Sequence, residues 1–226
     1  SGKNSFLNSG AKKIILKNLK KENFFIYLKK SKNPELVELK KIYNLYLKFR
    51  PKLIIGIGGG AVIDYAKLAS TRFKIGNKKE LQPILIKKKN CKLLILPTTS
   101  GSGAESTKFS VLYVNNKKFS VEDNLLKPDF YCLHPKFNLS NSSYQKSCSG
   151  LDAFCQSVES IFSANANNES IKYATKSIKI FMDNFKFFLT KPNLVNSKKM
   201  LQCANYSGKA INITKTNVPH ALSYYL

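Results

Sequence analysis

A glycine run behind an apolar segment is the first part of this sequence that could do chemistry. Residues Leu53–Ile57 are apolar, and Gly58–Gly60 follow them directly. Glycine has no Cβ, so such a turn lets the backbone bend sharply and lie close against a ligand. A helix starting near Ala61 would direct its free N–H groups and the positive end of its dipole toward that ligand. The pattern predicts a pyrophosphate site, with a plain tight turn as the alternative.

A second segment of the same kind lies further along the chain. The apolar residues Leu93–Leu96 lead into a loop of small hydroxyl and glycine residues that includes Thr98, Thr99 and Ser102. A glycine-rich turn between a strand and a helix is a weak signal by itself. Two such segments in succession strengthen the prediction of a phosphate site.

Candidate metal ligands lie in the second half of the chain. Asp152 and Gln156 are four residues apart in a predicted helix, and residues at this spacing share one helix face, so both can point into one cavity. Asp152 has a structural alternative, because the helix dipole favours acidic side chains near a helix N-terminus. His220, taken alone, is more often a structural histidine than a ligand.

The two glycine and hydroxyl segments resemble the signatures of the iron-containing alcohol dehydrogenase family. The family patterns are GGGS-x-x-D-x-AK and PTT-x-GTGSE, and they stand here as GGGAVIDYAK at 58–67 and PTTSGSGAE at 97–105. Ala61 replaces a serine and Ser102 a threonine. The resemblance implies an NAD or NADP cofactor. The residues it assigns to that cofactor are Gly58, Gly59, Gly60, Ala61, Asp64, Thr98, Thr99, Ser102 and Lys118.

Residues 149–160, SGLDAFCQSVES, are similar to the metal helix of the same family, G-x-DA-x-x-HA-x-EA. The resemblance implies a divalent metal, iron or zinc, on Asp152, Gln156 and His220, with Asp152 and His220 as catalytic residues. Gln156 stands where the family has histidine, and an amide oxygen is a weaker and harder ligand than imidazole. The family's fourth ligand is expected beyond Leu226. Glu159 is expected to be a structural hydrogen-bonding group.

The sequence around these ligands narrows the resemblance to one branch of the family. The sequence pattern resembles that of phosphonoacetaldehyde reductases in two features: Gln156 in the metal helix, and His220 within PHALSY. This implies NAD(P)H-dependent reduction of a small anionic aldehyde, phosphonoacetaldehyde, to 2-hydroxyethylphosphonate. The alternatives are another short-chain alcohol dehydrogenase or aldehyde reductase of the family, a dehydroquinate synthase-like lyase, and a non-catalytic basic binding protein.

The composition limits the possible partners. The net charge is +25, but only Arg50 and Arg72 are arginines and the longest lysine run is Lys87–Lys89. Nucleic-acid sites favour clustered arginine, so we expect solvated lysine faces, no nucleic-acid partner, and a field that can attract an anionic substrate. The chain has no run of 18 apolar residues and no apolar signal core at Ser1–Ser5, which favours a cytoplasmic protein without a membrane span. A homodimer is left open.

Strand and helix patterns alternate in the first part of the chain and give way to helices in the second. We expect an α/β dinucleotide-binding domain with a parallel sheet at 1–139 and an all-α metal and substrate domain at 140–226. The resemblance implies a dehydroquinate synthase-like architecture, with a first strand before Ser1 and more helices after Leu226. The strands expected are Asn23–Leu28, Leu53–Ile57, the segment from Leu93, Ser110–Val114 and Asp129–Leu133. The helices expected are Ser9–Lys20, one from Pro34 to Phe49, one including Asp64, Ser147–Phe162, Glu169–Leu189 and Ser197–Thr214.

Overall fold

The structure is a computed structural model, and it describes residues 1–19, 24–76, 84–216 and 220. The chain divides into two compact units. The first joins Ser1–Leu96 to Lys108–Cys132, and the second joins Pro97–Thr107 to Leu133–Leu226. The first is an α/β unit and the second is helical, which confirms the predicted fold class.

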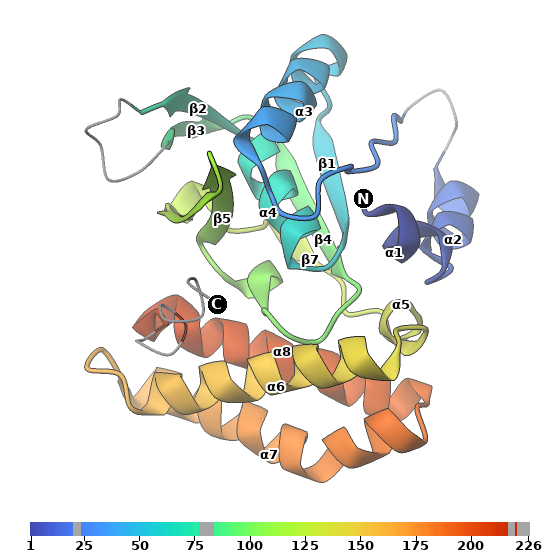
Figure 1. The fold of residues 1–226 in the computed structure, drawn as a ribbon, viewed down its shortest axis with the longest axis vertical. Coiled ribbons are helices and arrows are strands. Elements are labelled where there is room, and N and C mark those ends of the chain that lie inside the picture. The colour runs from blue at the N-terminus through green and yellow to red at the C-terminus, as the bar shows by residue number, and fades with distance from the viewer. Residues whose placement is uncertain (20–23, 77–83, 217–219, 221–226) are drawn as a thin grey trace. The chain divides into compact units, whose positions relative to one another are not determined.

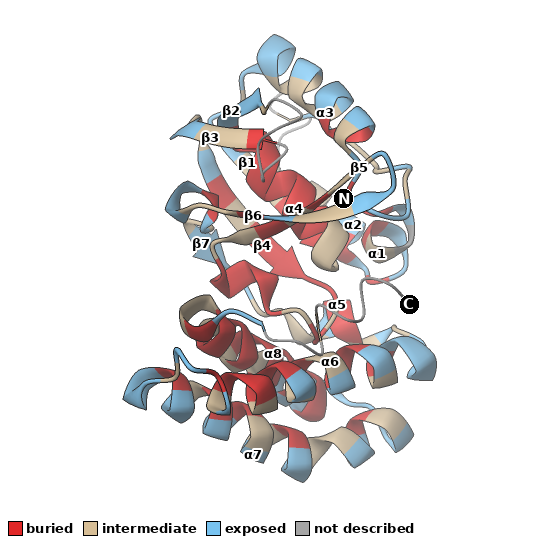
Figure 2. Ribbon diagram, turned by 60° about the vertical axis from the view of Figure 1, so that its left-hand side comes forward, coloured by how far each residue is buried: buried red, intermediate tan, exposed pale blue. Residues whose placement is uncertain are grey.

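The α/β unit is built around a strand, a turn and a buried helix. Strand β1 runs into helix α4, and α4 contributes Leu68 to a core that also includes Leu39 and Leu112. Figure 2 shows α4 as buried over most of its length. The elements of the unit are α1 (Lys3–Leu7), α2 (Ala11–Asn18), α3 (Leu36–Phe49), β1 (Leu53–Gly58), α4 (Gly60–Ala69), β2 (Thr71–Ile75), β3 (Ile84–Lys89), β4 (Lys92–Pro97), β5 (Phe109–Val114), β6 (Lys117–Glu122), the 3-10 helix η3 (Asn124–Leu126) and β7 (Phe130–Tyr131).

The strands of this unit form three small sheets. The first has the order β1-β4-β7, and its β4 and β7 are parallel. The others are antiparallel pairs, β2 with β3 and β5 with β6. The second pair places Ser110–Val114 in a hairpin, where the sequence had suggested only a further strand of the α/β layer.

The helical unit consists of three long helices that lie side by side (Figure 1). Its elements are the 3-10 helix η2 (Ala104–Ser106), α5 (Pro135–Leu139), α6 (Ser143–Ile161), α7 (Asn168–Thr190) and α8 (Leu194–Thr214). Side chains of Ser142, Asn167 and Asn193 cap the N-termini of the long helices, as expected for residues whose oxygens accept from free helical N–H groups. The core between the helices includes Phe181 and Met200.

Three local predictions were wrong. Residues 24–28 form no strand, and the only bridge among the described residues next to them joins Lys29 to Gly2. A continuous apolar run does not by itself supply a strand partner. Asn23 lies outside the described residues. Pro34 precedes the N-cap Glu35 instead of sitting in the first helical turn. An apolar run such as Leu53–Ile57 is typical of a strand buried on both faces of a parallel sheet, but Leu53 is 41% exposed and β1 is buried only from Gly56 onward.

The compact units do not coincide with the predicted segments 1–139 and 140–226. The loop Pro97–Thr107 and the residues from Leu133 onward group with the helices. The assignment of cofactor and metal roles to the two segments stays a prediction. Within the described part of the chain, no helix combines the length and apolar character needed to cross a bilayer.

Candidate functional site

The glycine turn joins β1 to α4 in the α/β unit. Gly59 is the N-cap of α4, with φ −79° and ψ −172°, and its carbonyl accepts the amides of Val62 (3.0 Å) and Ile63 (3.2 Å). The first N–H groups of a helix have no acceptor inside the helix. Here these include the backbone N–H groups of Gly60 and Ala61. Gly59, Gly60 and Ala61 are all partly exposed. The turn therefore has the donors and the access that an anion needs.

The preceding glycine has a packing role. A Cβ at Gly58 would lie 2.6 Å from a methyl group of Val62, and one at Gly56 would lie 2.7 Å from Ile95 and 2.8 Å from Ala66. Both glycines therefore let α4 approach the sheet closely. The access for a ligand begins one residue later, at Gly59.

Asp64 and Lys118 lie together in a buried, charged part of the α/β unit. Asp64 is buried on α4, and burial raises the pKa of its carboxyl group, while the charges of Lys67 and Lys118 act in the opposite direction. Lys67 is fully buried and donates to the carbonyl of Phe109 at 2.7 Å. Lys118 is half-buried and its neighbour Lys117 is exposed, so Lys118 is the lysine of the β5–β6 hairpin with an inward partner.

The second loop is clamped by backbone contacts within the helical unit. Gly103 adopts φ +56°, and a Cβ there would lie 2.3 Å from the carbonyl of Ala204 and 2.6 Å from Gly208. A Cβ at Gly101 would lie 2.9 Å from the carbonyl of Ser149. Because Ser149 belongs to α6 and Ala204 to α8, the loop is held on both helices. The two glycines are required by this close approach.

Asparagine side chains complete the clamp, and no sequence motif indicated them. Asn205 donates to Glu105 Oε1 (3.0 Å) and Ser106 Oγ (2.7 Å). Asn138 donates to Ser100 Oγ (3.1 Å), and Asn141 donates to the carbonyl of Thr98 (2.7 Å). These residues are 38 to 100 positions away from their partners, so no local motif reveals them.

The predicted cofactor residues are divided between the two units. Thr98 is buried, whereas Thr99 and Ser102 are half-buried and accessible. The α/β unit holds Gly58, Gly59, Gly60, Ala61, Asp64 and Lys118, and the helical unit holds Thr98, Thr99 and Ser102.

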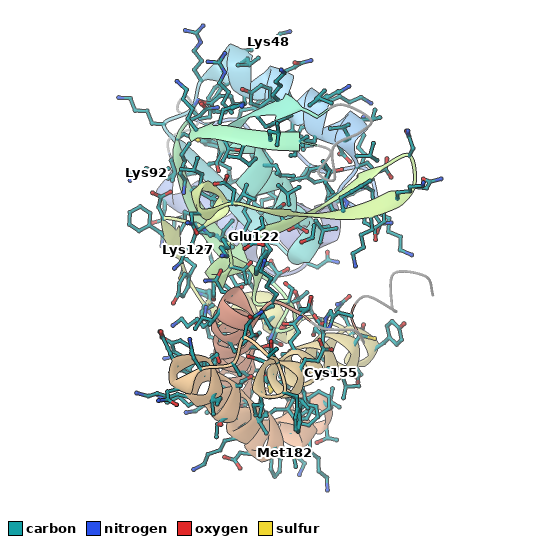
Figure 3. All side chains as sticks on the ribbon, turned by 90° about the vertical axis from the view of Figure 1, so that its left-hand side faces the viewer. Lys48, Lys92, Glu122, Lys127, Cys155 and Met182 are labelled. Carbon is teal, nitrogen blue, oxygen red and sulfur yellow. The ribbon has the colours of Figure 1, made fainter. Side chains whose placement is uncertain are left out.

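The predicted metal ligands come together within the helical unit. Asp152, Gln156 and Glu159 follow one face of α6, and His220 approaches that face after the end of α8. Gln156 Nε2 donates to Asp152 Oδ1 at 3.0 Å, and Ser207 Oγ donates to Gln156 Oε1 at 3.1 Å. His220 Nε2 lies 3.4 Å from Asp152 Oδ1, and His220 Nδ1 lies 2.7 Å from Glu159 Oε1. Figure 3 labels Cys155, the neighbour of Gln156 on α6.

The electrostatics of this cluster favour a cation. Hydrogen bonding with Asp152 raises the pKa of the His220 imidazole; burial acts against this, and Glu159 adds to the rise. An unprotonated Nε2 places its lone pair toward a carboxylate oxygen 3.4 Å away, an arrangement that a proton or a metal ion between the two atoms would stabilise. The site therefore attracts positive charge at the point where Asp152 and His220 meet.

Gln156 fits the same cation in one of its two amide orientations. As placed, its nitrogen faces Asp152 and its oxygen faces Ser207. The reverse orientation suits Ser207 equally, because a hydroxyl donates and accepts, but it brings two oxygens together unless a cation lies between them. Carboxylate, imidazole and amide oxygen form a donor set suited to a borderline divalent metal. The residues present therefore fit a metal ion.

The set differs from a metal site built from ionisable ligands alone. Among the residues that the structure describes, no group of three or more His, Cys, Asp and Glu side chains is placed to hold a metal ion. Asp152 and His220 supply two such side chains, and the amide of Gln156 would be the third ligand.

Comparisons with known proteins agree with the motifs. The family model of the iron-containing alcohol dehydrogenases matches residues 1–135. The phosphonoacetaldehyde reductase of Streptomyces viridochromogenes is 26% identical over 193 residues, which cover 78% of this chain and 48% of that protein. The aldehyde-alcohol dehydrogenase of Streptococcus pneumoniae is 24% identical over 208 residues, which cover 85% of this chain and 23% of that protein.

A solved structure shares the fold over nearly the whole chain. The sulfoacetaldehyde reductase from Bifidobacterium kashiwanohense, in complex with NAD+, matches with a TM-score of 0.89 at 21% identity. The match covers 98% of this chain and 60% of that one. The chain therefore spans less than two thirds of the length of each of these three proteins.

Proposed function

The chain belongs to the iron-containing alcohol dehydrogenase family, and from this premise we propose that it reduces an aldehyde to an alcohol with NAD(P)H and the assistance of a divalent metal. One observation carries the proposal beyond family membership. His220, Asp152 and Gln156, which are distant in sequence, converge where a cation would be stabilised. A structural role for His220 would not require its Nε2 to face a carboxylate.

The glycine turn of the α/β unit would bind the cofactor. The amides of Gly60 and Ala61 would receive the pyrophosphate, with Gly59 leaving room for it. The family resemblance also assigns Thr98, Thr99 and Ser102 of the second loop to the cofactor, and we retain that assignment. Support for a nicotinamide cofactor comes from the family and from the NAD+ complex of the sulfoacetaldehyde reductase. Both NAD and NADP remain candidates.

The metal, iron or zinc, would be held by Asp152, Gln156 and His220. When bound, the ion supplies Lewis-acid polarisation of the aldehyde oxygen, and the nicotinamide supplies the hydride. Asp152 would contribute the negative charge that retains the ion, and Gln156 would contribute a neutral oxygen. Ser207 holds the far end of the Gln156 amide, so the side chain stays within reach of Asp152.

The leading substrate is phosphonoacetaldehyde, with 2-hydroxyethylphosphonate as the product. Support comes from Gln156 in the metal helix and from the 26% identical phosphonoacetaldehyde reductase. The net charge of +25 adds a field that favours a small anionic aldehyde. Another aldehyde reductase of the family is the second candidate, favoured by the match to an aldehyde-alcohol dehydrogenase over 85% of this chain.

Steady-state reduction of three aldehydes tests this function. Phosphonoacetaldehyde, succinic semialdehyde and propanal are compared with NADH and with NADPH. A site built to pair a phosphonate leaves buried groups unpaired when it binds propanal, so kcat/KM should favour phosphonoacetaldehyde about a hundredfold or more. Equal or faster turnover of propanal contradicts the phosphonate assignment. No turnover of any aldehyde by the metal-loaded protein contradicts the reductase assignment itself.

A further inference from the structure

We propose that Glu159 orients His220 for metal binding, by holding the imidazole proton on Nδ1 and so leaving Nε2 unprotonated toward Asp152. The inference rests on the proposed metal site and goes beyond it. It makes Glu159 a positioning residue, whereas the sequence suggested only a structural hydrogen-bonding group.

Two distances decide where the proton lies. Glu159 Oε1 is 2.7 Å from His220 Nδ1, and Asp152 Oδ1 is 3.4 Å from His220 Nε2. A hydrogen bond from a ring N–H to a carboxylate is strong near 2.7–2.9 Å and weakens beyond that range. A neutral imidazole carries one ring proton. Both carboxylates compete for that proton, and the shorter contact places it on Nδ1.

The environments of the two carboxylates favour the same outcome. The Glu159 side chain is only 9% exposed, whereas that of Asp152 is 38% exposed. A buried carboxylate depends more strongly on a donor, because water replaces a lost hydrogen bond poorly there.

The spacing along α6 explains how one helix can serve both nitrogens. Asp152 and Glu159 are seven residues apart, which is close to two helical turns, so their carboxylates lie on the same face. The imidazole lies between them, with one nitrogen toward each. A metal ion takes only an unprotonated imidazole nitrogen. The hydrogen bond to Glu159 therefore leaves Nε2 unprotonated and able to bind a metal ion on the side of the ring that faces Asp152.

The tautomer of His220 can be read directly by nitrogen NMR. The sequence contains two histidines, His134 and His220, so 15N-histidine labelling gives two imidazoles to assign. In the metal-free protein, at a pH where the imidazole is neutral, His220 should carry its proton on Nδ1. The reverse tautomer is the commoner one for an unconstrained imidazole, so Glu159→Leu should move the proton to Nε2. His134 should not change.

Zinc affinity supplies the second readout. Competition with a chromophoric chelator should show that Glu159→Leu weakens zinc binding by about 10- to 100-fold, the usual effect of losing a carboxylate behind a metal-binding histidine. Glu159→Gln keeps an acceptor oxygen in the same place and should retain both the tautomer and most of the affinity. Asp152→Asn is the matched control: it should lose zinc affinity while His220 keeps its proton on Nδ1.

A neutral wild-type His220 with its single proton on Nε2 would overturn the inference, and this result needs no variant to fold. Unchanged zinc affinity in a folded Glu159→Leu protein would overturn it as well. The outcome is separate from the aldehyde assay. An Nδ1 tautomer controlled by Glu159, in a protein that binds zinc but reduces no aldehyde, would keep this inference and contradict the proposed function.

Discussion

The amide of Gln156 sets the strength of the proposed metal site. It is neutral. Its oxygen accepts a hydrogen bond from Ser207, and its nitrogen donates one to Asp152. Imidazole binds borderline divalent metals better than an amide does. The amide of Gln156 must also rotate before its oxygen can face the metal. A site of this kind should hold its metal less tightly than one with histidine at the same position.

Gln156→His should therefore increase metal retention. After dialysis against a mild chelator, the variant should keep more iron or zinc per chain than the wild type. Elemental analysis of the dialysed proteins measures this. Equal or lower metal content in a folded variant would indicate that Gln156 does not contact the metal.

Neighbouring glycines of the first turn should respond differently to substitution. Gly59 has an ordinary extended φ of −79°, so a side chain there does not strain the backbone. It would, however, fill the space beside the amides of Gly60 and Ala61. We predict that Gly59→Val abolishes NAD(P)H binding in a fluorescence titration while circular dichroism shows the fold retained.

Gly58→Ala supplies the contrast for that experiment. Its Cβ would meet Val62 at 2.6 Å, so this variant should lose thermal stability, whatever its effect on the cofactor. Unaltered nucleotide affinity in Gly59→Val would remove the glycine turn from the proposed site.

At the scale of elements, one carboxylate ties helix α3 to the segment before it. Glu38, in the first turn of α3, accepts from Tyr27 Oη (2.9 Å), the Lys30 amide (2.6 Å) and the Ser31 amide (2.8 Å). Burial by itself would raise the pKa of Glu38, but these hydrogen bonds and the Ser31 hydroxyl outweigh it and lower the pKa from 4.5 to about 2. The ionised form therefore stabilises the fold.

Glu38→Gln should destabilise the protein in a pH-dependent way. Replacing the carboxylate leaves amide donors facing an amide group, at a cost of about 2 kcal/mol. Because the folded pKa is the lower one, this stabilisation is present above pH 4.5 and is lost as the pH falls toward about 2. Urea unfolding of both proteins across that range should show the difference shrinking on acidification. A difference that is constant with pH would contradict this role of Glu38.

The long helices could be predicted closely from sequence, and the short strands could not. The predicted helix Glu169–Leu189 corresponds to α7 at Asn168–Thr190, because amphipathic periodicity over many residues is a strong local signal. Residues 24–28 are also apolar, but a strand forms only where a partner strand pairs with it. The local sequence does not reveal that partner. The strand expected at Asp129–Leu133 is limited to Phe130–Tyr131 in the structure, since the length of a strand also depends on its partner.

The candidate site shows the same division. Motifs predicted Asp152, Gln156 and His220, which the structure brings together. They did not predict Ser207 as the partner of Gln156, nor the asparagine clamp on the second loop. Such residues act through distant contacts, and serine and asparagine are common in any polar surface, so their sequence carries no distinguishing pattern.

For the whole molecule, charge is spread instead of being gathered on one element. The net charge is +25, and Figure 3 labels Lys48 on α3, Lys92 on β4 and Lys127 after η3, all of them exposed. Scattered lysines supply a general positive field without the arginine clusters of a nucleic-acid site. This distribution agrees with an anionic small-molecule substrate.

The metal dependence of aldehyde reduction is the most direct measure of whether a bound ion assists the reaction. The protein is stripped with a chelator, reloaded with Fe2+ or Zn2+, and assayed by NAD(P)H oxidation with phosphonoacetaldehyde, beside Asp152→Asn treated identically. The stripped wild type should lose activity by about a hundredfold or more, since Lewis-acid stabilisation is worth several kcal/mol. Metal should restore the wild type and leave Asp152→Asn inactive. Full activity after stripping, or equal restoration of Asp152→Asn, would contradict the account.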